Sequence, residues 1–159
     1  MKPFLIVVDD FLDQKEIFNL KNLKFNYETD KLNLFHHIEV FHPFINFISC
    51  FYNLKNCLGY EIWKQQNTRP KGWHFDKDEK IFQETKEIRF PICTLIYYLK
   101  CQNVKGGRLF FKDSGENSIS PKQNRIILFS SGIEHYVEPF DGERTSIIIN
   151  PWNTSLGIL

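Results

Sequence analysis

Residues 87–112 read EIRFPICTLIYYLKCQNVKGGRLFFK, two runs rich in β-branched and aromatic residues with Gly106 and Gly107 between them. Such runs favour strands, and adjacent glycines favour a turn. The same pattern recurs along the C-terminal part of the chain, where turn residues separate the runs. It predicts strands at residues 60–65, 72–76, 87–100, 108–112, 125–129, 134–138 and 144–151. Strands joined by short turns in this way indicate an antiparallel sandwich or jelly roll.

The segment before residue 60 has a different pattern. An apolar run at residues 4–8 predicts a short buried strand. A helix is predicted over residues 13–24, with Asp9 or Asp10 as its cap. The apolar face of this helix would consist of Ile17, Phe18 and Leu20.

A second helix is predicted over residues 43–58, because Pro43 suits a first helical turn and apolar residues follow at three- and four-residue spacing. Residues 28–42 are expected to be irregular, and residues 77–87 are expected to form a solvated loop. The histidines of the irregular segment, which lack ligand spacing, are expected at the surface: His36, His37 and His42. The predicted fold class is therefore α+β, mainly β, with helices on one face of the strands.

The composition describes a folded chain with no strong charge bias. Its 159 residues fit one domain, and the 20 Lys and Arg residues nearly balance the 19 Asp and Glu residues. A net charge of +1 supplies no long-range attraction, so neither nucleic acid nor a membrane is the expected partner. The chain has 16 Phe and no Ala, which indicates AT-rich codons and a low-GC bacterium or a virus as the source.

The four cysteines indicate a reducing compartment. They form no CxxC pair, and the chain is not a small secreted scaffold, so free buried thiols are expected, and a disulfide or a metal role is the alternative. The apolar run near the N-terminus is too short for a signal peptide. The expected location is the cytoplasm, or the host cytoplasm if the source is a virus.

Three residues suggest a metal site. His74 and Asp76 are two positions apart on a predicted strand, so both side chains point to the same face. His135 lies on a later predicted strand. Two histidines and one carboxylate can bind one side of a non-haem Fe(II) ion and leave the other positions open. The alternative is that the His-x-Asp pattern arises by chance and the histidines are ordinary surface or core residues.

A second pair points to a carboxylate ligand. Arg144 and Ser146 share a face of a predicted strand, and a guanidinium group can donate two parallel hydrogen bonds to a carboxylate. Without the metal-binding pattern, Arg144 would be interpreted as a surface residue at a strand end.

These motifs resemble the 2-oxoglutarate- and Fe(II)-dependent dioxygenases, and among them the prolyl 4-hydroxylase group. The resemblance covers residues 60–152, and it implies a double-stranded β-helix, the cupin-like jelly roll, with residues 1–59 contributing a strand and supporting helices. The matching blocks are His74-Phe75-Asp76, then Arg89, Thr94 and Tyr97-Tyr98-Leu99, then Gly106-Gly107-Arg108-Leu109-Phe110, then Pro121 and Ile127-Leu128-Phe129, and finally Glu134-His135, Pro139, Gly142-Glu143-Arg144 and Trp152.

The resemblance implies a role for each site residue. The catalytic iron ligands would be His74, Asp76 and His135. The residues that would bind the cosubstrate 2-oxoglutarate are Arg144, Tyr98, Ser146, Thr94 and Trp63. Trp73 would form either a wall facing the substrate or part of the outer sheet surface, and Arg89 either a substrate contact or a structural ion pair.

The implied activity is hydroxylation of an aliphatic C–H bond, with succinate and CO2 as coproducts. The expected substrate is a prolyl residue in a peptide or protein, and the expected cofactors are Fe(II), 2-oxoglutarate and O2, with ascorbate as a further candidate. A free amino acid or another small molecule is the alternative substrate. A cupin-like module that binds a metal or ligand without turnover is the alternative function. We expect a monomer or a weak homodimer.

Overall fold

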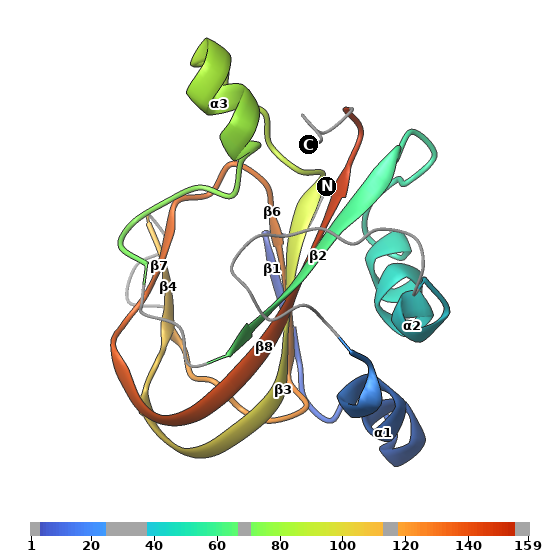
Figure 1. Cartoon of the computed structure of the whole chain (residues 1–159), viewed down its shortest axis with the longest axis vertical. Helices are drawn as coiled ribbons and strands as arrows, with labels where there is room; N and C mark the ends of the chain where they lie inside the picture. The colour runs from blue at the N-terminus through green and yellow to red at the C-terminus, as the bar shows by residue number, and fades with distance from the viewer. Residues whose placement is uncertain (1–3, 25–37, 67–70, 113–117, 155–159) are drawn as a thin grey trace.

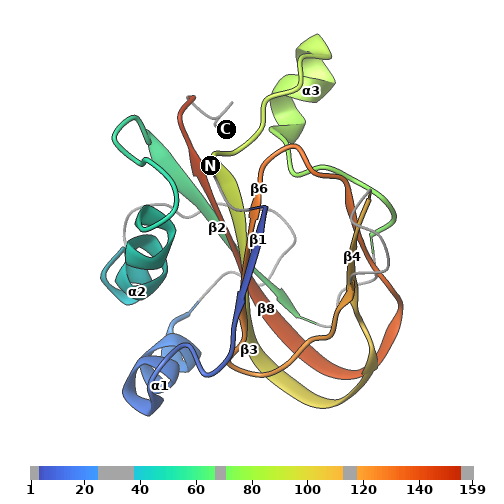
Figure 2. The same ribbon diagram turned by 180° about the vertical axis from the view of Figure 1, so that it is seen from behind.

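The computed structural model describes residues 4–24, 38–66, 71–112 and 118–154. Two antiparallel sheets face each other, and two helices cover the outer side of the larger sheet (Figures 1 and 2). The larger sheet has the strand order β1 (Leu5–Val8), β6 (Ile126–Ser130), β3 (Cys93–Gly106), β8 (Phe140–Trp152) and β2 (Gly59–Gln66). The smaller sheet has the order β5 (Ser118–Ile119), β4 (Leu109–Phe111) and β7 (His135–Val137). This is the jelly roll with N-terminal helices that the sequence predicts.

The long strands β3 and β8 join the two sheets. They pair from Leu95 opposite Ile149 to Gly106 opposite Phe140, and both curve from the larger sheet toward the smaller one (Figure 1). The pairing shifts register at two places, as is typical where a sheet bends. At Gly142, with a φ of 92°, an added Cβ atom would lie 2.3 Å from the backbone oxygen of Asn103, so the close approach of the two strands requires glycine there.

Alternation along β3 divides the interior into two apolar clusters. Leu95 and Tyr97 face the helices and belong to the outer cluster. Ile96 and Tyr98 face the smaller sheet and belong to the inner cluster. Because successive strand residues point to opposite faces, a polar residue in phase with Ile96 must lie between the sheets. This inner face holds the candidate site.

The helices pack against the outer cluster. In α1 (Gln14–Asn22), Ile17 and Leu20 are buried as predicted. Phe18 is 67% exposed, so the prediction that it belongs to the apolar face is wrong. The cap is Asp13 and not Asp9 or Asp10, because Asp13 Oδ1 accepts a hydrogen bond from the Glu16 backbone N–H at 2.7 Å.

The second helix differs from its predicted range. α2 (Ile38–Ser49) begins before Pro43 and ends nine residues before position 58. Phe44 and Ile48 are fully buried, and the Phe44 ring lies 5.1 Å from the Tyr97 ring. The helix contains His42, which is exposed as predicted; His36 and His37 lie outside the described residues.

A third helix replaces the loop predicted at residues 77–87. α3 (Glu79–Thr85) is capped by Asp78, whose Oδ1 accepts a hydrogen bond from the Ile81 backbone N–H at 3.0 Å. The helix buries none of its side chains, so it lacks the apolar stripe by which sequence patterns reveal helices.

Several predicted strands also differ in extent. Residues 72–76 form a single bridge between His74 and His135 and no longer strand. β3 begins at Cys93 and not at residue 87, and it continues to Gly106. β8 begins at Phe140 and not at residue 144, and β5 was not predicted. The four cysteines are free, as predicted, but the expected burial is wrong for three of them: Cys93 is buried, whereas Cys50 is exposed and Cys57 and Cys101 are half-buried. No helix among the described ranges combines the length and apolar character needed to cross a bilayer.

Asn124 connects the N-terminal segment to the sheet, and its removal tests this packing. Its Oδ1 accepts hydrogen bonds from the Leu12 backbone N–H at 2.9 Å and the Tyr97 hydroxyl at 3.0 Å, and its Nδ2 donates to the Leu12 oxygen at 2.9 Å. We predict that Asn124→Ala lowers the free energy of unfolding by about 3 kcal/mol in urea denaturation, because three hydrogen bonds are lost.

Asn124→Asp is the matched control, because it keeps the acceptor and tolerates the positive φ of 62° at this position, while an anionic oxygen replaces the amide donor. Its cost should be smaller than that of Asn124→Ala. Equal costs for both variants, or a cost below about 0.5 kcal/mol for Asn124→Ala, would contradict this account of the packing.

Candidate metal centre and cosubstrate pocket

The backbone places His74 directly beside His135. The backbone N–H of His74 donates to the His135 oxygen at 3.0 Å, and the N–H of His135 donates to the His74 oxygen at 2.9 Å. The two imidazole rings have centroids 4.3 Å apart. This reciprocal pair brings together two residues that are 61 positions apart in the chain.

Asp76 completes the cluster. Its Oδ1 lies 4.0 Å from His74 Nε2, and its Oδ2 lies 3.8 Å from His135 Nε2. One ligand atom from each of the three residues lies within 4.8 Å of the other two. Two ligands bonded to one ion at about 2.1 Å lie at most about 4.2 Å apart, so the side chains would have to move slightly closer together around an ion. The structure therefore brings the three predicted ligands together.

Hydrogen bonds from neighbouring groups orient the three side chains. His74 Nδ1 lies 2.7 Å from the Gly72 oxygen, and His135 Nδ1 lies 3.0 Å from the Ile133 oxygen. Each Nδ1 therefore carries the proton, which leaves each Nε2 lone pair directed toward Asp76.

Burial favours the neutral imidazole at His74. It lowers the pKa of His74, and the neighbouring His135 lowers it further. Two imidazoles and one carboxylate, with positions left open, are the donor set that suits non-haem Fe(II). The residues present thus fit the predicted metal.

Thr94 has a contact that the sequence did not reveal. Its hydroxyl donates a hydrogen bond to Asp76 Oδ2 at 2.7 Å, so it holds one of the candidate ligands. Thr94 is buried and shares the inner face of β3 with Tyr98, as predicted. Its placement follows from strand alternation, but its partner depends on how residues 72–78 fold back over the sheet.

Arg144 is a buried cation on the inner face of β8. It is 5% exposed, its Nη1 donates to the Gly107 oxygen at 3.3 Å, and its guanidinium lies 4.2 Å from the centroid of the Phe140 ring. Burial lowers the pKa of Arg144. An added Cβ atom at Gly107 would lie 3.4 Å from Nη1, so glycine there leaves room for the guanidinium.

The other predicted cosubstrate residues line the same face. Tyr98 and Ser146 are cross-strand partners on β3 and β8, and both are buried. Burial raises the pKa of Tyr98 to about 12, which keeps its hydroxyl protonated and able to donate. Trp63 on β2 pairs with Ile148 and packs against the inner cluster.

Two residues with alternative predicted roles now have defined surroundings. Trp73 is 51% exposed, and its ring centroid lies 5.4 Å from that of Tyr136, on the outer side of the smaller sheet. Arg89 forms an ion pair with Glu87 at 3.0 Å. Both fit the structural alternatives weighed for them.

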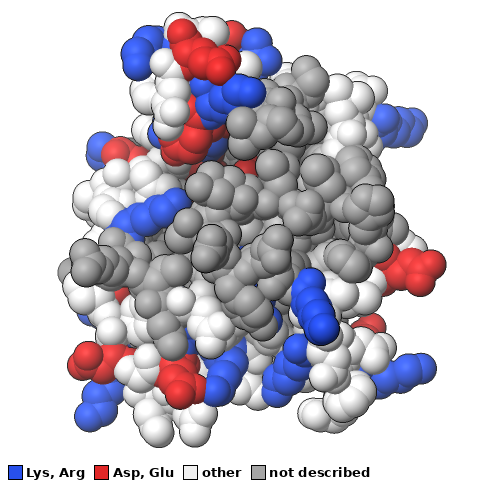
Figure 3. Space-filling view, in the orientation of Figure 1, with Lys and Arg blue, Asp and Glu red and all other residues white. Residues whose placement is uncertain are grey.

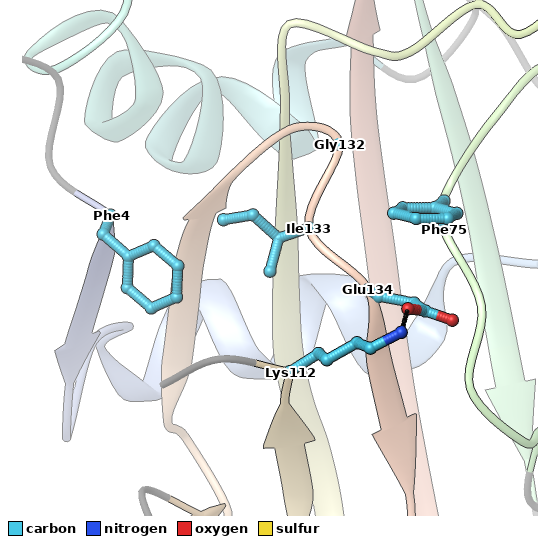
Figure 4. Close-up of a pocket in the computed structure, with 6 residues that line it drawn as sticks. All are labelled: Phe4, Phe75, Lys112, Gly132, Ile133 and Glu134. Carbon is cyan, nitrogen blue, oxygen red and sulfur yellow. Dashed lines mark hydrogen bonds and ion pairs between the residues drawn. The ribbon is translucent and has the colours of Figure 1, made fainter. Parts of the chain in front are cut away.

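A pocket of about 310 Å³ lies next to this cluster but is separate from it. Phe4 and Ile133 line one part, and Lys112 and Glu134 form an ion pair across another (Figure 4). Phe75 points into this pocket (Figure 4), whereas its neighbours His74 and Asp76 point to the candidate metal site. The pocket lining therefore does not include the three candidate ligands.

The surface charges are mixed. On the face shown in Figure 3, Lys and Arg side chains lie among Asp and Glu side chains, most clearly on α3. Glu61 was not predicted as a site residue, although it lies two residues before Trp63 on β2 and therefore points to the same inner face. Alternation with Trp63 was the available signal.

Comparison with known proteins agrees with this geometry. Residues 61–152, more than half of the chain, match the model of the 2OG-Fe(II) oxygenase superfamily, in which 2OG is 2-oxoglutarate. No curated protein sequence matches the chain.

Solved structures share the fold at low sequence identity. A viral collagen prolyl hydroxylase from Paramecium Bursaria Chlorella virus-1, in its 2OG complex, has a TM-score of 0.61 and 19% identity, over 94% of this chain and 96% of that one. A Pseudomonas putida prolyl-4-hydroxylase has a TM-score of 0.63 and 14% identity, over 95% and 88%. A Trichoplax adhaerens prolyl hydroxylase, in complex with a hypoxia inducible factor peptide fragment, has a TM-score of 0.59 and 16% identity, over 94% and 83%.

The family match agrees with the two histidines and one aspartate of the candidate metal site, since the family uses Fe(II) and 2-oxoglutarate. The chain therefore belongs to the 2OG-Fe(II) oxygenase superfamily and is a dioxygenase with a fold like that of prolyl hydroxylases.

Proposed function

We propose that this dioxygenase hydroxylates an aliphatic C–H bond of a prolyl residue in a peptide or protein, and that His74, Asp76 and His135 hold its Fe(II). The observation that carries the proposal is the cluster in which ligand atoms of these three residues lie within 4.8 Å of one another. The fold likeness to prolyl hydroxylases supports the choice of substrate.

The metal and cosubstrate supply the oxidation, with succinate and CO2 as coproducts. The chain supplies orientation and charge. Arg144 binds the distal carboxylate of 2-oxoglutarate, and its burial strengthens that attraction because little water competes. The protonated hydroxyl of Tyr98 is a second donor, and Ser146 opposite it is a third. Trp63 and the inner apolar cluster exclude water from the reacting atoms.

Further features of the proposal concern the protein as a whole. Residues 1–159 act as one domain, since helix and strand residues share the outer apolar cluster. The free cysteines favour a cytoplasmic location. Ascorbate would be the reductant that keeps the iron in its Fe(II) state, and we expect the protein to act as a monomer or a weak homodimer.

Mass spectrometry tests the reaction directly. Proline-containing peptides and free proline are incubated with the protein, Fe(II), 2-oxoglutarate and O2, and succinate is measured in parallel. We expect one added oxygen atom on the substrate for each succinate formed. Tight metal binding without turnover of any candidate would instead support the alternative of a non-catalytic metal- or ligand-binding module.

The ligand assignment predicts the effect of removing each imidazole or the carboxylate. His74→Ala, Asp76→Ala and His135→Ala should each lower succinate formation more than about 100-fold, because metal affinity depends on every ligand. Calorimetric titration with Mn(II) should show the same loss of metal binding. His42→Ala is the matched control, since His42 is exposed on α2. Unchanged turnover in any of the three variants would refute the assignment.

The hydrogen bond from Thr94 predicts a smaller effect. Thr94→Val removes the donor that orients Asp76 while keeping the side-chain shape, so Mn(II) affinity should fall about tenfold. Thr94→Ser keeps a hydroxyl and should recover most of the affinity. If valine and serine give equal affinities, the hydroxyl does not orient the ligand.

The role of Arg144 predicts a defect in cosubstrate binding alone. Arg144→Gln should raise the KM for 2-oxoglutarate about 100-fold, because a charge-assisted pair of hydrogen bonds is lost, while Mn(II) affinity stays the same. Arg108→Gln is the control, because exposed Arg108 pairs with Glu138. A wild-type KM for 2-oxoglutarate in Arg144→Gln would exclude this role.

A further inference from the structure

Two polar side chains beside the candidate metal site have no part in the proposed reaction. Glu61 on β2 and Asn150 on β8 are cross-strand partners. The pair two positions away on the same strands is Trp63 and Ile148. Ile148 belongs to the inner cluster, and Trp63 packs against it. Because side chains two positions apart share a face, Glu61 and Asn150 also point between the sheets.

The strand register places this pair next to the metal ligands. Leu95 on β3 pairs with Ile149 on β8 in antiparallel fashion. The residue before Leu95, Thr94, therefore lies opposite the residue after Ile149, Asn150. Thr94 in turn donates its hydrogen bond to Asp76. Neighbouring strands are about 4.8 Å apart, so a continuous polar row runs from Asp76 across Thr94 and Asn150 to Glu61.

Asn150 is buried with an unsatisfied oxygen. It is 1% exposed, and its Oδ1 has no hydrogen-bond partner among the described residues. A buried oxygen without a donor is costly, so such a group in a folded protein indicates a missing partner.

Glu61 adds a carboxylate to the same place. Its Oε2 accepts a hydrogen bond from Trp152 Nε1 at 3.2 Å. Burial, with a smaller contribution from the negative charges of Asp76 and Asp78, raises the pKa of Glu61 to about 7, although the hydrogen bond from Trp152 and the charge of Lys71 act in the opposite direction. A cation brought to this carboxylate would favour its ionised form. The pair therefore offers hydrogen-bond acceptors and a negative charge, and needs donors and a positive charge.

We propose that Glu61 and Asn150 bind a protonated amine of the substrate, so that the hydroxylated proline is an N-terminal residue or a free amino acid. This inference rests on the proposed hydroxylase function: it narrows a peptide substrate to one with an N-terminal proline, and it also admits free proline, which is the alternative substrate. A proline inside a peptide has no N–H group, so it cannot donate to either acceptor. A proline with a free amino group is a secondary ammonium with two N–H donors and a positive charge, which matches the two acceptors.

The charges of the inner face agree with an amine site at Glu61 and Asn150. Arg144 is the buried cation that binds the carboxylate of the cosubstrate in the proposed function, and Glu61 supplies the negative charge elsewhere on the same face. A substrate ammonium would be repelled by Arg144 and attracted by Glu61. The cosubstrate carboxylate and the substrate ammonium would therefore bind at different places on the inner face.

Binding of four ligands tests the proposal. The protein is loaded with Mn(II) and 2-oxoglutarate and titrated calorimetrically with L-proline, Pro-Gly-Gly, acetyl-Pro-Gly-Gly and acetyl-Gly-Pro-Gly. We expect L-proline or Pro-Gly-Gly to bind at least about tenfold more tightly than either acetylated peptide, because charge-assisted hydrogen bonds are lost on acetylation. Comparison of the two unblocked ligands separates a free amino acid from a peptide N-terminus. Equal affinities for blocked and unblocked ligands, or no binding of any, would overturn the proposal.

Variants assign the effect to the two residues. Glu61→Gln should remove most of the preference for the unblocked ligand while the Kd values for Mn(II) and 2-oxoglutarate stay within about twofold of wild type. Asn150→Leu should weaken the same ligand by replacing an acceptor with an apolar group. Glu39→Gln, at an exposed position on α2, is the matched control and should retain the preference. A full preference in Glu61→Gln would overturn the proposal.

Turnover measurements under O2 separate this inference from the function on which it rests. Oxidation of acetylated and unblocked prolines at equal rates would leave the hydroxylase function intact and reject the amine site. Absence of 2-oxoglutarate-dependent oxidation with every ligand would reject the hydroxylase function, even where the binding preference for the amine persists.

Discussion

The antiparallel pairing of β3 with β8 is the interaction on which the rest of the structure depends. These two strands lie inside the larger sheet and then curve toward the smaller one (Figure 1). They therefore form one wall of the space between the sheets and determine where that wall bends. Their alternation sends one set of side chains to the helices and the other to the site. The bend is possible because Gly142 lets the two backbones approach where any Cβ atom would collide.

Strand alternation explains why much of the site could be predicted from the sequence. Arg144 and Ser146 share a face simply because they are two residues apart on one strand, and the structure keeps both on the inner face. The bond between Thr94 and Asp76 could not be predicted, because it depends on the path of residues 72–78 over the sheet and not on a local period. The same limit applies to Glu61, whose partner Asn150 is identified only once the register of β2 and β8 is known.

The elements that were predicted incorrectly from the sequence have related physical causes. α3 buries no side chain, so its residues lack an apolar period and its charged sequence resembles a loop. α2 begins at Ile38, so Pro43 lies inside the helix and not in its first turn, and the usual preference of proline for the first turn gave the wrong start. The cap of α1 was placed at the first aspartates, whereas Asp13 has the glutamate three residues later that a capping box needs.

The single bridge between His74 and His135 has a mechanical consequence. The backbone of residues 72–76 is bonded to β7 through one reciprocal pair of hydrogen bonds, whereas a full strand would have several. An ion held by His74, Asp76 and His135 would therefore act as a crosslink that fastens this edge segment to the smaller sheet. Metal binding at these residues would then be coupled to the docking of this edge, and the segment that leads into α3 would be the part of the fold whose stability depends most on the metal.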